Sequence, residues 1–230
     1  MSGDREAILG RIREALRVPA PRHHERPAPV PAGLPVTAPF REWLPPVGES
    51  EGERIALFGR LSEMLRTEFI ECRDAKAAAA HIAALAAEGG WKKLARHSGA
   101  LSDAVALHLP PQLPRMSTDA AYDKLELETC DAGLSECECL VAQTGSVCIT
   151  GPSSGGRALS VLPPHHIVVA HRHQMLSDLT AAYELLARKY AGGYPSFITF
   201  ITGPSRTGDI ERILVLGAHG PKKLTVLLVP

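Results

Sequence analysis

The pattern of apolar and polar positions is clearest in the last part of the chain. Three short apolar runs rich in β-branched residues occupy positions 197–202, 212–216 and 224–229. Two segments that begin with glycine and contain proline, 203–211 and 217–221, separate these runs and carry ionisable or hydroxyl side chains. Short apolar runs between turn-forming residues are typical of buried strands. Because open α/β sheets bind ligands in loops at strand ends, we expect the two segments to form one site.

Helical spacing and strand-like runs alternate along the rest of the chain. Residues 2–17 have an amphipathic pattern, with Ile8, Ile12 and Leu16 on one face. The region 98–133 predicts only short elements. The alternation as a whole predicts an α/β fold with a mostly parallel sheet flanked by helices and antiparallel hairpins at its edge. Further helices are predicted at 50–66, 74–88 and 176–190, and further strands at 69–72, 93–97, 139–142, 146–150 and 167–170.

Proline content divides the chain into three parts. Nine of the nineteen prolines lie between residues 19 and 46, where few large apolar residues occur. Segments of this kind form extended, semi-rigid tethers rather than helices. We therefore expect a helical arm at 1–18, an extended linker at 19–47 and a single α/β domain at 48–230. The arm either packs on its own domain or docks on a second subunit, which would make the protein a homo-oligomer.

Composition narrows the class of protein. The 230 residues include 25 basic and 25 acidic side chains, and this balance argues against a long nucleic-acid groove. No apolar run approaches the roughly 20 residues of a membrane-spanning helix. The N-terminal segment is charged and lacks the apolar core of a signal peptide. We therefore expect a cytoplasmic protein with no membrane span and no nucleic-acid partner.

The cysteines argue against a metal or redox centre held by this chain. Their odd number, without an export signal, does not fit a disulfide framework. Cys137 and Cys139 form a close pair, but no second cysteine pair or Cys/His group has the spacing of metal ligands. We therefore predict no metal, no iron–sulfur cluster and no other cofactor. The five cysteines are Cys72, Cys130, Cys137, Cys139 and Cys148.

The first segment with candidate chemistry is 203–209. Gly203 and the proline after it interrupt strand pairing, which leaves the hydroxyls of Ser205 and Thr207 available as donors. If Asp209 opens a helical turn, the free N–H groups of that turn favour an anion, and Arg206 adds a bidentate grip on a carboxylate or phosphate. In the alternative interpretation, Asp209 caps the turn and Arg206 is an ordinary surface side chain. The segment lacks the Gly-Lys-Ser/Thr ending of a Walker motif.

A second candidate is the turn Thr144-Gly145-Ser146, with Arg157 eleven residues after Ser146. Two hydroxyls around a glycine suit hydrogen bonding to a polar ligand, and the arginine supplies positive charge. The alternative is a tight hairpin in which the Thr144 and Ser146 side chains satisfy backbone groups of the turn. These four residues are predicted to bind ligand together with the 203–209 segment.

Histidines and a glutamate are the candidates for proton transfer. His219 lies between glycines at a strand end, next to Gly220, where packing gives little reason for an imidazole. It is predicted to donate or accept a proton near neutral pH. The alternative is a ring that only hydrogen-bonds the loop. Glu136 and Glu138 precede the Thr144 strand and are further candidates as general bases, of which Glu138 is preferred. His165 and His166 before the 167–170 strand, and His171 and His173 after it, are weaker candidates, either as site residues or as metal ligands.

Four motifs in the second half of the chain together resemble the lactate utilization protein C family, whose domain is the LUD domain. The resemblance covers about residues 133–229. The family usually has threonine at Ser146 and alanine at Gly208, and neither difference removes a charged group. The motifs are Thr144-Gly145-Ser146, Gly156-Arg157 with Leu162-Pro163, Gly203-Pro-Ser-Arg-Thr-x-Asp-Ile-Glu211 and Gly217-x-His-Gly-Pro221.

The resemblance implies a fold like that of sugar-phosphate isomerases, coenzyme A transferases and formyltetrahydrofolate cyclo-ligase. It also implies a role in oxidising L-lactate to pyruvate beside iron–sulfur oxidoreductase proteins, with this chain binding a small anionic ligand. The alternatives are a stand-alone isomerase, transferase or cyclo-ligase, or a sensor of a carboxylate or phosphate compound. In each case Thr144, Arg157, Arg206, Asp209 and His219 are expected to converge around one cleft.

Overall fold

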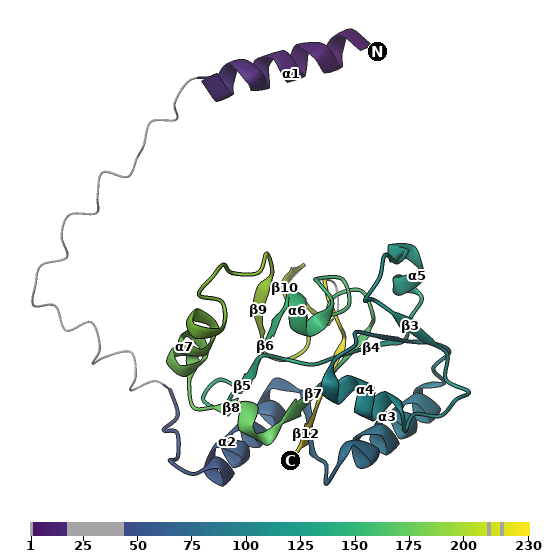
Figure 1. Ribbon diagram of the computed structural model, residues 1–230, viewed down its shortest axis with the longest axis vertical. Coiled ribbons are helices and arrows are strands. Elements are labelled where there is room, and N and C mark those ends of the chain that lie inside the picture. Colours follow the sequence, from purple (N-terminus) through teal and green to yellow (C-terminus); the bar gives the residue numbers. More distant parts are fainter. Residues whose placement is uncertain (1, 18–43, 211–212, 217–218) are drawn as a thin grey trace, which may run out of the picture. The chain divides into compact units, whose positions relative to one another are not determined.

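The computed structural model describes residues 2–17, 44–210, 213–216 and 219–230 (Figure 1). The chain divides into two compact units, Met1–Trp43 and Leu44–Pro230. In the first unit, helix α1 (Ser2–Arg17) forms where the amphipathic pattern predicts it, and its Ile8 side chain is exposed. The predicted linker lies largely outside the described residues. The amide of Gln143 donates to the carbonyl of Pro45, so the second unit includes the last residues of that predicted linker.

A six-stranded parallel sheet is the centre of the second unit (Figure 1). Every pair of neighbouring strands in it is parallel, which confirms the predicted α/β class. β7 and β12, the two longest strands, lie side by side in the middle. In order across the sheet, the strands are β1 (Glu68–Glu71), β12 (Lys223–Val229), β7 (His165–His171), β4 (Ala132–Ser135), β2 (Leu94–Arg96) and β3 (Arg115–Ser117).

Both faces of this sheet are buried, and for this reason its central strands read as continuous apolar runs. Successive side chains of a strand point to opposite faces. Ile167 and Val169 of β7 therefore pack in one core cluster, with helices α3 (Ala75–Gly89) and α4 (Ala100–Ala106). Val168 and Ala170 pack in another cluster on the opposite face, with helix α2 (Glu51–Leu65). Helix α5 (Lys124–Glu128) belongs to the region of short elements between β3 and β4.

The helix boundaries follow from capping residues. Ser50 and Glu53 form a capping box at the start of α2, and the Asp74 side chain accepts the N–H of Ala77 at the start of α3. α3 ends where Gly90 adopts a left-handed conformation with φ of 60°. Helix α7 (Leu179–Lys189) begins later than the predicted residue 176, because Asp178 caps it.

A second, four-stranded sheet packs beside the first and contains the predicted hairpin. β5 and β6 pair antiparallel, as do β6 and β9, whereas β5 and β8 are parallel. α7 covers one face of this sheet, where Cys139 and Cys148 pack against Ala182 and Leu186. The strands, in order, are β8 (Met175–Leu176), β5 (Cys139–Val141), β6 (Ser146–Thr150) and β9 (Ile198–Ile201), and the one-turn helix α6 (Gly151–Ser154) follows β6.

The segment after Gly203 differs from the prediction. We expected a loop through residue 211, in which a helical turn at Asp209 would favour an anion, but Arg206–Ile210 is strand β10 and pairs antiparallel with β11 (Ile213–Leu216). The register shifts between Thr207 and Ile210, where Gly208 allows a bulge. The condition of a helical turn at Asp209 is not met, because the backbone of this segment instead hydrogen-bonds to the apolar run that follows it.

Two observations concern metals and membranes. Within the ranges that the structure describes, no three His, Cys, Asp or Glu side chains lie close enough together to hold a metal ion. The helices of this same part of the chain include none that is long and apolar enough to span a membrane.

Candidate functional site

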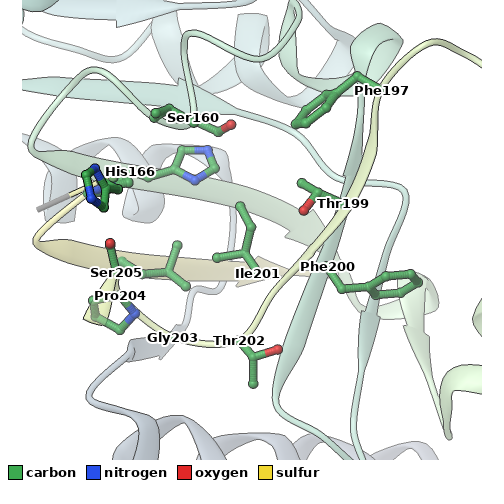
Figure 2. A pocket seen from close by; sticks show the side chains of 15 residues that line it. Ser160, His166, Phe197, Thr199, Phe200, Ile201, Thr202, Gly203, Pro204 and Ser205 are labelled. Atoms are coloured by element: carbon green, nitrogen blue, oxygen red, sulfur yellow. The ribbon is translucent and has the colours of Figure 1, made fainter. Parts of the chain in front are cut away.

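A cavity of about 300 Å³ lies between the two larger sheets (Figure 2). Its walls come from the end of β9 and the loop after it, from the loop before β12, and from the starts of β7 and β12. Of the described residues that line it, none is Lys, Arg, Asp or Glu. The lining residues are Ser160, Val161, His166, Phe197, Thr199 to Ser205, His219 to Pro221, and Leu224.

The two glycine-bounded segments meet at this cavity. Gly203 and Ser205 line it from the first segment, and His219 and Gly220 line it from the second. The N–H of Ser205 donates to the Pro221 carbonyl over 3.0 Å, which ties the segments together. They lie at the carboxyl end of β9 and the amino ends of β7 and β12, since His166 and Leu224 are the second residues of those strands.

The Thr144–Ser146 turn reaches the cavity through hydrogen bonds. The Ser146 hydroxyl lies 2.7 Å from the Thr144 hydroxyl and 2.7 Å from the Thr202 hydroxyl. Thr202 lines the cavity, whereas Thr144, Gly145 and Ser146 do not. The turn therefore supports the wall instead of forming it.

Two glycines of the motifs are required by packing against the end of α2. A β-carbon at Gly145 would lie 2.8 Å from Cδ1 of Leu65, and one at Gly203 would lie 2.8 Å from the Leu65 carbonyl oxygen. Both glycines also have positive φ, of 65° and 87° respectively. These features favour the interpretation that the glycines permit close backbone approach.

The replacement Gly203→Ala is expected to destabilise the protein by about 2 kcal/mol, because it combines a left-handed backbone with a contact to a carbonyl that cannot rotate away. Urea unfolding measures this change. Gly192→Ala is the matched control, since a β-carbon there meets no atom within 4 Å, and its effect should stay within about 0.5 kcal/mol. Equal effects of the two replacements would contradict the packing explanation.

The two predicted arginines do not line the cavity. The Arg206 guanidinium donates to the carbonyl of Leu65, at the carboxyl end of α2, where a cation is favourable. Nη2 of Arg157 donates to the Ser196 carbonyl over 2.9 Å, and its guanidinium carbon lies 5.6 Å from the Phe197 ring centroid. Phe197 lines the cavity, so Arg157 is linked to the cavity through its contact with this ring and not as a lining residue.

Two further predicted residues, Thr207 and Asp209, belong to β10, and their side chains lie outside the described part of the structure. Of the five residues expected to converge around one cleft, His219 lines the cavity. Thr144, Arg157 and Arg206 do not line it, although the two loops themselves meet there.

Glu138 occupies a separate, buried cluster away from the cavity. Its carboxylate accepts hydrogen bonds from Lys189 Nζ at 2.6 Å, the Tyr190 hydroxyl at 2.6 Å and the Thr150 hydroxyl at 2.7 Å. Burial raises the pKa of this carboxyl group, but the three hydrogen bonds outweigh burial and keep the pKa below its ordinary value. A carboxylate so fully occupied is a poor general base, so the geometry favours a structural role.

His166 is the cavity residue that sequence reasoning undervalued. It is buried, and its Nε2 lies 2.9 Å from the Ser135 hydroxyl. Burial lowers the pKa of His166 to about 3, with a smaller contribution from His165, so the ring is neutral near pH 7. The alternation of side chains along a strand could have identified His166 from the sequence. Of two adjacent histidines at the start of a strand buried on both faces, one must point to each side.

The neighbouring His165 points away from the cavity. Its Nε2 lies 2.7 Å from the Thr225 hydroxyl, and its ring packs edge-on against Trp91 with centroids 5.4 Å apart. Burial, followed by the nearby Lys223, lowers the pKa of His165 to about 4. The pair therefore places one neutral imidazole on each face of the sheet.

Comparisons with known proteins agree with the motifs. The chain is 28% identical over 205 residues to lactate utilization protein C of Geobacillus kaustophilus, covering 82% of this chain and 83% of that protein. It is 31% identical over 166 residues to lactate utilization protein C of Deinococcus radiodurans, covering 68% of this chain and 74% of that protein.

A solved structure shares the fold. The crystal structure of a DUF162 family protein from Deinococcus radiodurans superposes with a TM-score of 0.63 at 23% identity, covering 80% of this chain and all of that one. The sequence profile of the LUD domain matches residues 57–229, which include both sheets and both loops of the cavity. The chain therefore belongs to the LUD domain family.

Proposed function

We propose that this protein acts in lactate utilization and that its cavity binds a small ligand of that process. The relatives named lactate utilization protein C support the biological role. The observation that carries the binding proposal is the meeting of two glycine-bounded loops at one cavity, where Ser205 and His219 contribute polar groups. Cavities of a few hundred Å³ with a few polar groups on apolar walls are the usual form of small-molecule sites.

The walls refine the kind of ligand that we propose. The described lining has apolar side chains such as Phe197, Ile201 and Leu224, and its polar groups are hydroxyls and imidazoles. An anionic ligand would therefore rely on hydroxyl and backbone donors and on His219 at the exposed rim. A strongly charged phosphate compound fits these walls less well than a small carboxylate or a neutral compound.

The binding proposal is tested by thermal shift with L-lactate, pyruvate and a sugar phosphate. A compound that binds only the folded state raises Tm with its concentration. We expect L-lactate or pyruvate to do so, and we expect His219→Ala to weaken binding by about fivefold, the size of one hydrogen bond. His108→Ala is the control, because His108 is also exposed and does not line the cavity.

Two results would contradict the binding proposal. One is that none of the three compounds raises Tm as its concentration increases. The other is a shift that is unchanged when Ser205→Phe fills the cavity, because that ligand would bind elsewhere.

For the wider role, we propose that iron–sulfur oxidoreductase partner proteins carry the electrons of lactate oxidation in the cytoplasm, while this chain binds the ligand. The five cysteines are all buried, so their thiols are not presented at the surface. The arm in the unit Met1–Trp43 is the proposed contact with a partner or a second copy. Co-purification of the full chain from cells grown on L-lactate tests this. Equal recovery of partners and an equal oligomeric state after deletion of residues 1–43 would reject the arm as the contact.

A further inference from the structure

The protonation of His166 follows from its hydrogen-bonded neighbours. Nε2 of His166 lies 2.9 Å from Oγ of Ser135, and that hydroxyl donates to the Glu136 carbonyl over 3.1 Å. A carbonyl oxygen only accepts, so in this hydrogen bond the Ser135 proton points toward Glu136, and in that arrangement Oγ accepts a hydrogen bond from Nε2 of His166. Nε2 therefore carries the hydrogen of the neutral ring, and Nδ1 is a bare acceptor.

This acceptor is buried and unpaired. His166 is 1% exposed, and its Nδ1 has no hydrogen-bond partner among the described residues. Buried polar atoms are nearly always paired, and an unpaired one weakens the folded state. The ring belongs to the wall of the cavity, where Figure 2 shows the side chains of Ser160, Phe197 and Thr199 around the same space. The ring lines the cavity while Nδ1 itself is covered, so a ligand that displaces its cover and reaches Nδ1 would supply the missing donor.

We propose that Nδ1 of His166 accepts a hydrogen bond from the hydroxyl of a bound ligand, so that the cavity selects hydroxy compounds over the corresponding carbonyl compounds. The inference rests on the proposed function, since it requires the cavity to bind a ligand. An O–H at this position completes the chain of hydrogen bonds through Ser135 to Glu136. A carbonyl oxygen at the same position would set one lone pair against another and leave Nδ1 unpaired.

The selectivity has a direct consequence for the proposed role. A 2-hydroxy acid and the 2-oxo acid formed by its oxidation differ at this one oxygen. The cavity would therefore hold the reduced compound and release the oxidised one. Ser135 is a positioning residue in this arrangement, because it sets the tautomer of His166 and has no contact of its own with the ligand.

Matched pairs of probes test the proposal on the full chain by isothermal titration calorimetry. The pairs are 1-phenylethanol with acetophenone, and L-lactate with pyruvate. We expect the hydroxy member of each pair to bind at least about tenfold more tightly, the effect of a buried hydrogen bond against an unpaired acceptor. In His166→Leu this ratio should fall to about one. In the control His165→Leu, which alters the adjacent buried histidine that does not line the cavity, the ratio should persist.

The outcomes separate this inference from the proposed function. If hydroxy and carbonyl probes bind equally well to the wild type, and Ser205→Phe abolishes both, the cavity is a ligand site and the inference is overturned. An unchanged ratio in His166→Leu also overturns it. If no probe binds, the proposed ligand site fails and the inference fails with it.

The tautomer can be measured even if His166→Leu does not fold. In the ¹⁵N-labelled wild type, histidine side-chain spectra at pH 7 should show His166 with hydrogen on Nε2 and none on Nδ1. The hydroxy probe should shift the Nδ1 resonance in the direction of hydrogen bonding, and the carbonyl probe should not. A resonance pattern with hydrogen on Nδ1 would overturn the inference, because that nitrogen would then be a donor.

Discussion

Lowering the pH from 7 to 5 is expected to reduce the free energy of unfolding by about 4 kcal/mol, chiefly through His165 and His166. Both rings are buried at the start of β7, on opposite faces of the large sheet, and their pKa values are about 4 and about 3. Histidine in an unfolded chain has a pKa of about 6.5, so below that pH the unfolded chain binds protons that the native state does not. The stability contribution of each neutral ring is complete above pH 6.5 and is lost as the pH falls toward its native pKa.

The size of this loss of stability follows from the gap between the pKa of histidine in the unfolded chain and the lower pKa values of the two native rings. Between pH 7 and pH 5 each ring loses about 2 kcal/mol, because the unfolded chain becomes protonated while the native state remains almost fully neutral. The hydroxyls that contact the two rings, on Thr225 and Ser135, give no compensating negative charge. Among the charged groups near His165, Lys223 lowers its pKa and Glu68 partly opposes this.

Urea unfolding as a function of pH measures the effect. His165→Leu and His166→Leu should each remove about half of the pH dependence, whatever they do to stability at pH 7. His108→Gln is the control, since His108 is exposed, and it should leave the pH dependence unchanged. A difference of less than 1 kcal/mol between pH 7 and pH 5 in the wild type would show that the two rings are not buried as neutral groups.

Replacement of Glu138 by glutamine is expected to destabilise the protein by about 3 kcal/mol at pH 7. The carboxylate, 2% exposed, joins the end of α7, at Lys189 and Tyr190, to Thr150 at the end of β6. Glutamine has nearly the same size, but its NH₂ group cannot accept a hydrogen bond. One of the three donors therefore loses its acceptor, and the charge that faces Lys189 is removed.

Replacements of the residues that donate hydrogen bonds to Glu138 serve as comparisons. Tyr190→Phe removes one hydrogen bond and should cost about 1.5 kcal/mol. Lys189→Met should cost about 1 kcal/mol, because the lysine side chain is about half exposed and its ion pair is weakened by solvent. Urea unfolding at constant pH measures all three. If Glu138→Gln is no worse than Lys189→Met, the buried carboxylate is not the centre of the cluster.

Glu138→Gln also separates the structural role from the catalytic one that the sequence suggested. Glu138 does not line the cavity, so the folded variant should bind L-lactate or pyruvate as the wild type does. A large loss of ligand affinity in a variant that remains folded would return Glu138 to the list of site residues.

Local patterning was sufficient for the class of fold. The apolar strands β7 and β12 and the β5–β6 hairpin could be recognised from residue type and spacing, because strand burial and turn formation depend on neighbours in the chain. The predicted helices at 50–66 and 74–88 likewise begin within one residue of α2 and α3. The four ordered motifs were sufficient for the family, which the match over residues 57–229 confirms.

The tertiary structure decided which side chains face the cavity. Arg206 looked like an anion-binding residue, but its partner is the carbonyl of Leu65, 141 positions earlier in the chain. Glu138 looked like a free base, but Lys189 and Tyr190 approach it from α7. His166 looked incidental, and its importance depends on Ser135 in a neighbouring strand. The role of each side chain was set by contacts between residues far apart in the chain, and residue type and spacing carry no record of such contacts.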